Sequence, residues 1–125
     1  MKIHTEHIVL NVSKDKAFAY IAEYENIPKW SKNFILKLEK IGNEYTATTP
    51  VGKMKFEIAT DKSTGVIDIL LDGKPSPTRV IALGAEMTLY LFTLILPPNM
   101  PDAEFQGGIK GLQEELTLLK DQLEK

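Results

Sequence analysis

The chain contains no cysteine and only two histidines, His4 and His7. Without cysteine, disulfides, thiolate metal sites and cysteine nucleophiles are excluded, and a reducing compartment fits the composition. Side chains three residues apart on a strand point to opposite faces, so the two histidines cannot bind one metal ion together. The sequence therefore predicts no metal site and no cofactor.

Excess positive charge and glycine-rich phosphate loops are also missing. The formal net charge is −2 with charges of both signs interspersed, which leaves no basic field to hold a nucleic acid. No Gly-x-Ser-x-Gly elbow and no dinucleotide fingerprint follows a strand-like run. Gly107, Gly108 and Gly111 lie inside a helical pattern and do not form such a loop. These absences argue against nucleic acid and nucleotide partners.

Long apolar runs are missing as well. The most apolar stretch, Val80 to Leu96, is interrupted by Gly84 and Glu86 and is followed by two prolines. It falls short of the ~20 apolar residues that a bilayer span requires, so a pair of strands is the better interpretation. The N-terminus lacks the apolar region of a signal peptide. We expect one cytoplasmic domain over residues 1–125, without stable membrane insertion.

What the chain does contain is an apolar stripe between Asp102 and Lys125. Its members follow one another at alternating steps of four and three residues, which places them on one side of an α-helix. They are Phe105, Ile109, Leu112, Leu116, Leu119 and Leu123. Such a helix is roughly 33 Å long and needs an apolar surface to lie on. A coiled-coil seam is the alternative, but about two and a half heptads are fewer than such a seam usually needs.

The N-terminal part of the chain predicts one strand and two short helices. A run rich in β-branched residues, Ile3 to Val12, predicts the strand. Ser13 is a typical helix N-cap, and an apolar stripe from Ala17 to Ala22 predicts the first helix. Pro28 suits the first turn of a second short helix that ends at Trp30, the only tryptophan.

Beyond Phe34 the helical period disappears, and six strand-like runs follow one another with turn signals between them. They cover Ile35–Ile41, Glu44–Thr49, Lys53–Thr60, Val66–Leu71, Thr78–Leu83 and Glu86–Leu96. Their short connections imply hairpins, and hence an antiparallel meander with one polar and one apolar face. The C-terminal helix is the one element long enough to cover the apolar face.

Three segments carry a resemblance to a known family. They are Ile8 to Ile21, the segment Tyr24 to Trp30 with its Asn-Ile-Pro-Lys-Trp sequence, and Leu116 to Lys120 in the last helix. Together with the order of elements, they resemble the START/Bet v1-like (SRPBCC) superfamily, particularly its polyketide cyclase/dehydrase-like members. The resemblance implies an α+β helix-grip fold: a curved seven-stranded antiparallel sheet, two short helices and one long C-terminal helix. It also implies an apolar cavity between sheet and helix that holds a small hydrophobic molecule.

The wall of that cavity would come from inward-facing strand residues and from the helix stripe. The candidate ligand-binding residues are Met54, Phe56, Ile58, Ile67, Ile69, Leu71, Phe105, Gly108 and Leu112. Arg79 and Tyr90 are polar candidates, because both faces of their strands are apolar. The sequence shows no pair of side chains suited to acid–base chemistry, so no catalytic residue is predicted.

Gly108 leaves two interpretations open. A glycine inside a helix costs about 1 kcal/mol relative to alanine, and Gly108 lies roughly 40° from the centre of the apolar stripe. It either lets the helix backbone pack closely on the sheet or leaves space for a ligand beside Phe105 and Leu112.

The sequence favours binding or transport of a small hydrophobic ligand, by desolvation in a preformed concave site. Two alternatives stay open. One is a cyclase- or dehydratase-like enzyme, which would need polar side chains converging inside the cavity; the other is a protein-interaction domain with a filled core. A homodimer through an exposed strand edge or through Leu118 is a further open prediction.

Overall fold

The computed structural model describes all residues from Met1 to Lys125. The strands are β1 (Lys2–Leu10), β2 (Lys37–Ile41), β3 (Glu44–Thr49), β4 (Gly52–Asp61), β5 (Val66–Leu71), β6 (Lys74–Ser76), β7 (Thr78–Gly84) and β8 (Met87–Leu96). The helices are α1 (Lys14–Ile21), the 3-10 turn η1 (Tyr24–Asn26), α2 (Ile27–Trp30) and α3 (Asp102–Leu123). No helix is long and apolar enough to cross a membrane.

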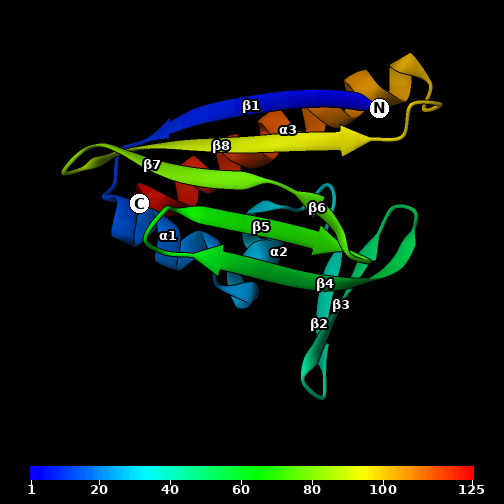
Figure 1. Cartoon of the computed structure of the whole chain (residues 1–125), viewed down its shortest axis with the longest axis horizontal. Helices are drawn as coiled ribbons and strands as arrows, with labels where there is room; N and C mark the ends of the chain where they lie inside the picture. Colours follow the sequence, from blue (N-terminus) through cyan, green and yellow to red (C-terminus); the bar gives the residue numbers. More distant parts are fainter.

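The strands form one antiparallel sheet in the order β1-β8-β7-β5-β4-β3-β2 (Figure 1). The predicted α+β helix-grip fold, with its meander and its long final helix, is confirmed. The sheet has one strand more than predicted, because β6 folds back on β5 within the turn-rich segment Asp72–Pro77. Asp72 and Gly73 have φ angles of 51° and 77°, which a two-residue type I′ hairpin requires at both positions. The turn residues therefore make a hairpin rather than a loop.

Three helices share the inner face of the sheet, which the sequence analysis assigned to the C-terminal helix alone. Figure 1 shows α3 running along β1 and β8 on one side of the sheet. It packs against β1 and α2, while α1 packs against β7 and β8. The short helices contribute their own buried side chains to the core: Ala17, Phe18, Ile21, Ile27 and Trp30. A short helix pair is therefore as necessary to this core as the long helix.

The opposite side of the sheet, which we call the outer face, is not polar over β1, β8 and β7. Along β8, the buried Tyr90 and Phe92 alternate with half-buried Leu89 and Leu91 that point outward. Six apolar side chains form what we call the outer patch: Ile3, Ile81, Leu89, Leu91 and Ile95, whose register places them on this face, and the exposed Leu83 at the bulge of β7. The prediction of one polar face is therefore wrong for this half of the sheet.

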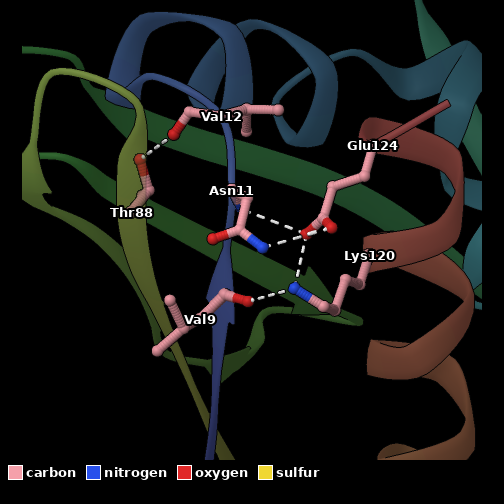
Figure 2. A network of polar contacts seen from close by, with 6 residues as sticks. All are labelled: Val9, Asn11, Val12, Thr88, Lys120 and Glu124. Carbon is pink, nitrogen blue, oxygen red and sulfur yellow. Dashed lines mark hydrogen bonds and ion pairs between the residues drawn. The ribbon is translucent and has the colours of Figure 1, made fainter.

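A polar network attaches the end of α3 to the end of β1 (Figure 2). The Nζ of Lys120 donates to the carbonyl oxygen of Val9 at 2.9 Å and forms an ion pair with Glu124. The Glu124 carboxylate accepts from the backbone N–H of Asn11 at 3.0 Å, and these bonds hold its pKa below the usual range. β1 is an edge strand of the sheet and ends at Leu10, so the end of α3 supplies partners for the Val9 carbonyl and the Asn11 N–H.

Replacing Lys120 with methionine tests this attachment. The variant loses the donor to Val9 and the partner of Glu124, so the last turn of α3 should separate from β1 more often. We expect the Asn11 amide to exchange its hydrogen roughly tenfold faster, measured by NMR hydrogen exchange. Lys110→Met, an exposed change on the same helix, is the matched control. Equal exchange rates in the two variants would contradict the assigned role of Lys120.

Candidate functional site

Four polar or aromatic side chains meet inside the core where α2, β8 and α3 come together. We call Trp30, Ser31, Tyr90 and Glu115 the grip cluster. Trp30, Tyr90 and Glu115 are fully buried and Ser31 is 8% exposed. The rings of Trp30 and Tyr90 pack edge to face with their centroids 6.3 Å apart, a favourable aromatic geometry. The cluster is thus a polar centre within an otherwise apolar interior.

Local structure explains why each member points inward. Tyr90 lies between the buried Thr88 and Phe92 in the alternation of β8, so it shares their face of the sheet. Glu115 comes three residues after Leu112 and four before Leu119, which puts it on the buried side of α3. Trp30 and Ser31 stand at the end of α2, which packs against α3.

The carboxylate of Glu115 joins α3 to the segment that follows α2. One carboxylate oxygen accepts from the Ser31 hydroxyl at 3.2 Å. The other accepts from the backbone N–H groups of Asn33 and Phe34, at 2.8 Å and 3.0 Å. The side-chain amide of Asn33 in turn donates to the carbonyl oxygen of Gly111 at 3.0 Å. Four hydrogen bonds therefore hold α3 against one short segment.

Burial raises the pKa of Glu115 to about 7, although the two backbone N–H groups and the Ser31 hydroxyl oppose that shift. Desolvation disfavours the charged carboxylate, whereas hydrogen bonds to it favour the charged form. The carboxyl group therefore changes protonation near neutral pH. When protonated, it can donate to the Ser31 hydroxyl oxygen instead of accepting from it.

Two atoms of the grip cluster have no hydrogen-bond partner: Trp30 Nε1 and Tyr90 Oη. Burial raises the pKa of Tyr90, and the charge of Glu115 adds to that effect, so the phenol is neutral. The neighbouring Thr78 hydroxyl gives its hydrogen to the carbonyl oxygen of Ile67, so it can offer the Tyr90 hydroxyl only an acceptor, and the two do not meet in hydrogen-bond geometry. Leaving a buried polar atom without a hydrogen-bond partner costs about 1–3 kcal/mol. The rings that carry the two unpaired groups contact each other, so this part of the core holds two polar atoms that each require a partner.

The predicted ligand-binding residues fall into separate parts of the inner face. Phe56, Ile67 and Ile69 are buried on β4 and β5, where Met54, Ile58 and Leu71 are half-buried. Leu112 is in the core, but Phe105 lies under the Lys2 ammonium of β1 at 5.7 Å. In the sheet order, β7 and β5 stand between β8 and β4. The helix members of the predicted wall therefore lie beside β1 and β8, away from the β4 members.

The two polar candidates lie on opposite faces. Tyr90 points into the core, where it belongs to the grip cluster. Arg79 lies between the buried Thr78 and Val80, so it points to the outer face, where its Nε donates to the Thr64 carbonyl oxygen at 3.0 Å. Alternation along β7 thus removes Arg79 from the interior, which corrects its assignment to an internal site.

Gly108 packs closely on the sheet. A Cβ atom at this position would lie 3.6 Å from Leu96 Cδ1 and 3.7 Å from Leu94 Cδ2, ordinary van der Waals distances. Of the two interpretations, close packing of the helix backbone on β8 is the one that these distances support. The space beside Gly108 holds side chains of the sheet.

The two better-formed depressions of the surface are shallow, and neither includes a residue of α3. One, of about 220 Å³, lies on the outer face between Asp68, Arg79 and Leu91. The other, of about 320 Å³, opens where β3 stops pairing with β4 at Tyr45 and Phe56. Tyr24 also lines this depression, with its ring stacked on that of Tyr45 at a centroid distance of 4.2 Å. No group of three histidine, cysteine, aspartate or glutamate side chains comes together in the structure.

Sequence comparison finds no family model and no curated protein that matches the chain. Among solved structures, a START superfamily protein from Mycobacterium smegmatis is 12% identical, with a TM-score of 0.70 over 98% of this chain and 97% of its own. The aromatase/cyclase Zhui from a Streptomyces species is 13% identical, with a TM-score of 0.74 over 98% and 93%. The Aha1 dimer from Colwellia psychrerythraea is 16% identical, with a TM-score of 0.72 over 98% and 96%.

These likenesses define the class of fold. The chain has the helix-grip fold of START-like and aromatase/cyclase structures, as the resemblance in its sequence implied. Glu115 was not among the residues that the sequence analysis singled out. The sequence does contain an indication of it, because Glu115 is an acidic side chain at a position on the leucine-rich, buried side of the helix.

The raised pKa of Glu115 predicts that the protein loses stability as the pH rises. The carboxyl group titrates at its ordinary value of 4.5 in the unfolded chain and at about 7 in the folded protein. Its proton therefore stabilises the fold fully below pH 4.5, and this contribution of about 3 kcal/mol is lost as the pH rises through 7. Chemical denaturation at a series of pH values measures the effect.

Glu115→Gln isolates this contribution. The amide oxygen can accept from both backbone N–H groups, and the amide nitrogen can donate to the Ser31 hydroxyl oxygen, so all three bonds survive. The variant should lose the pH dependence that wild type shows between 4.5 and 7. Glu114→Gln, an exposed neighbour, should retain it. Identical pH profiles for wild type and Glu115→Gln would contradict the raised pKa.

Close packing at Gly108 predicts that alanine fits there. Gly108→Ala should stabilise the protein by about 0.5–1 kcal/mol, because alanine reduces the conformational freedom of the unfolded chain. Gly107→Ala, where a Cβ meets no atom within 4 Å, should give the same gain. Thermal or urea denaturation measures both. A loss of stability confined to Gly108→Ala would show that the gap between α3 and β8 is tighter than these distances indicate.

Proposed function

We propose that the protein binds a small, mostly apolar molecule in the interior between the sheet and α3. The polar end of that molecule would lie at the grip cluster. The observation that carries this proposal is the pair of fully buried, unpartnered polar atoms, Trp30 Nε1 and Tyr90 Oη. Native cores rarely leave such groups unpaired, and an unpaired group is a common mark of a bound water or ligand. The likeness to START-like structures supports a ligand-binding role for the fold.

The chemistry of the two atoms suggests what the ligand carries. The Trp30 indole can only donate a hydrogen bond, whereas the Tyr90 hydroxyl can donate or accept. A carbonyl or hydroxyl oxygen on the ligand is a group that either atom can bind. The surrounding leucine, isoleucine and phenylalanine side chains would take its apolar body, and desolvation would supply most of the affinity.

Ligand entry would require α3 to move relative to the segment after α2, because the described interior is filled around Gly108. The bonds from Ser31, Asn33 and Phe34 to Glu115 hold these two elements together. Glu115 would act as a latch whose strength depends on its protonation. We propose that the open state is the minor one and that ligand binding draws on it.

An acid–base enzyme is the second candidate, and one observation favours it. Glu115 has a pKa of about 7 and lies in the same cluster as Tyr90, and a carboxyl group with such a pKa suits proton transfer at neutral pH. The aromatase/cyclase likeness points the same way. A cyclase-like activity would need Glu115 to reach the ligand, so Glu115→Gln should abolish turnover while leaving binding intact.

The indole N–H of Trp30, the only tryptophan, gives a direct test by NMR. We expect 2-naphthol, an apolar ring with one hydroxyl, to shift this resonance saturably, and naphthalene to bind roughly tenfold more weakly. Tyr90→Phe should lower the affinity for 2-naphthol about tenfold without destabilising the free protein, because its hydroxyl has no partner to lose. Tyr45→Phe removes an exposed hydroxyl that bonds Glu25 and serves as the control.

Two results would contradict the proposal. One is a Trp30 resonance that neither probe shifts at saturating concentration. The other is a Tyr90→Phe protein that is less stable than wild type, which would mean that the Tyr90 hydroxyl already has a partner inside the protein.

A further inference from the structure

We propose that the outer patch is the interface between two copies of this chain, packed sheet against sheet. The patch lies on the opposite face of the sheet from the grip cluster, so the proposal does not depend on a ligand. Its starting point is that the outer face over β1, β8 and β7 carries apolar side chains where a solvent-exposed sheet carries polar ones.

The register of the strands places most of the patch residues in rows that run across β1, β8 and β7. Ile81 and Leu89 are partners across β7 and β8, and Ile3 and Ile95 are partners across β1 and β8. Two rows stand between these pairs: Leu91 with Arg79 on one side and His7 on the other, and Thr93 with its hydroxyl bonded to that of Thr5. The side chain of Leu83 is 51% exposed and that of Ile3 is 60% exposed. The patch therefore spans three strands, with the Thr5–Thr93 pair separating Ile3 and Ile95 from its other members.

The alternation of β1 supports the same conclusion. Its charged side chains, Lys2 and Glu6, point to the face that carries α3, where Lys2 lies 4.0 Å from Asp102 and Glu6 accepts from Gln113. The outer face of β1 carries Ile3, Thr5, His7 and Val9 instead, and none of its lysine or acidic side chains. An edge strand whose outer face is exposed to solvent would carry its charged side chains on that outer face. Over β4, by contrast, the outer face carries the usual charged residues, Lys53, Lys55 and Glu57.

Charge complementarity supports a second copy of this chain as the molecule that covers the outer patch. One acidic and one basic side chain, Asp68 and Arg79, line the depression of about 220 Å³ beside Leu91. A partner must present one basic and one acidic group in the reverse arrangement, and the same face rotated by a two-fold axis does so. Arg79 uses Nε for the Thr64 carbonyl, which leaves its terminal N–H groups free for a carboxylate.

Packing between two such faces would follow the geometry of a β-sandwich, with outward side chains interdigitating between the sheets. Asp68 of each copy would meet Arg79 of the other beside the apolar centre. Leu118, the other contact that the sequence analysis considered, packs against the core instead.

The test is the oligomeric state of the full chain over a concentration series, measured by sedimentation equilibrium. Wild type should dimerise, and Leu83→Lys should raise the dimer Kd by roughly tenfold or more, because it buries a charge in the patch. Val51→Lys changes an equally apolar residue that is 81% exposed in the turn between β3 and β4. It should leave the dimer unchanged.

A pair of charge reversals tests the two-fold pairing itself. Asp68→Arg and Arg79→Asp each place like charges opposite one another, so each variant alone should be monomeric where wild type is dimeric. Mixing them brings two basic groups against two acidic groups and should restore a heterodimer. Far-ultraviolet circular dichroism confirms that each variant is folded.

Three outcomes would overturn the proposal. A wild type that stays monomeric at the highest concentration has no such interface. A dimer that survives Leu83→Lys and both charge reversals uses another surface, such as a strand edge. A monomer that binds vesicles of neutral phosphatidylcholine through the patch has a lipid surface as its partner instead.

Discussion

The buried carboxylate of Glu115 is the contact on which the arrangement of the helices depends. It accepts from one hydroxyl and two backbone N–H groups in the segment between α2 and β2. A hydrophobic side chain at the same place would fill the space but leave the N–H groups of Asn33 and Phe34 without an acceptor. The same bonds bring the end of α2, and with it Trp30, against α3 and Tyr90. The contact that closes the fold therefore also builds the polar centre of its core.

Local patterns were sufficient to predict the order of elements, because alternation and helical period depend on neighbours in the sequence. They were not sufficient for the site. The partners of Glu115 are backbone groups more than eighty residues away, and nothing in the sequence indicates which N–H groups a turn leaves free. Trp30 and Tyr90 were each visible as single residues, but only the packing of α2 against β8 brings them together. Arg79 was misplaced because an apolar run on both faces removes the alternation that assigns a face.

β8 contributes side chains both to the core and to the outer patch. Its inward residues, Tyr90 and Phe92, belong to the core beneath α3, while Leu89 and Leu91 belong to the outer patch. A strand that must be apolar on both faces reads as one continuous run, as Met87–Leu96 does. Such a run is typical of strands that are covered on both sides, and here only one cover lies within the chain. The composition of β8 is therefore consistent with a fold that is completed by a second molecule.

The two unpaired polar atoms of the grip cluster are proposed to bind the polar end of a ligand. Native mass spectrometry of the protein purified from its own cells tests this claim most directly. The account predicts a small-molecule adduct on the wild-type chain that is absent or depleted on a Trp30→Phe, Tyr90→Phe double variant. If both proteins give only the mass of the ligand-free chain, this proposal is contradicted, and the interior between the sheet and α3 is a closed core.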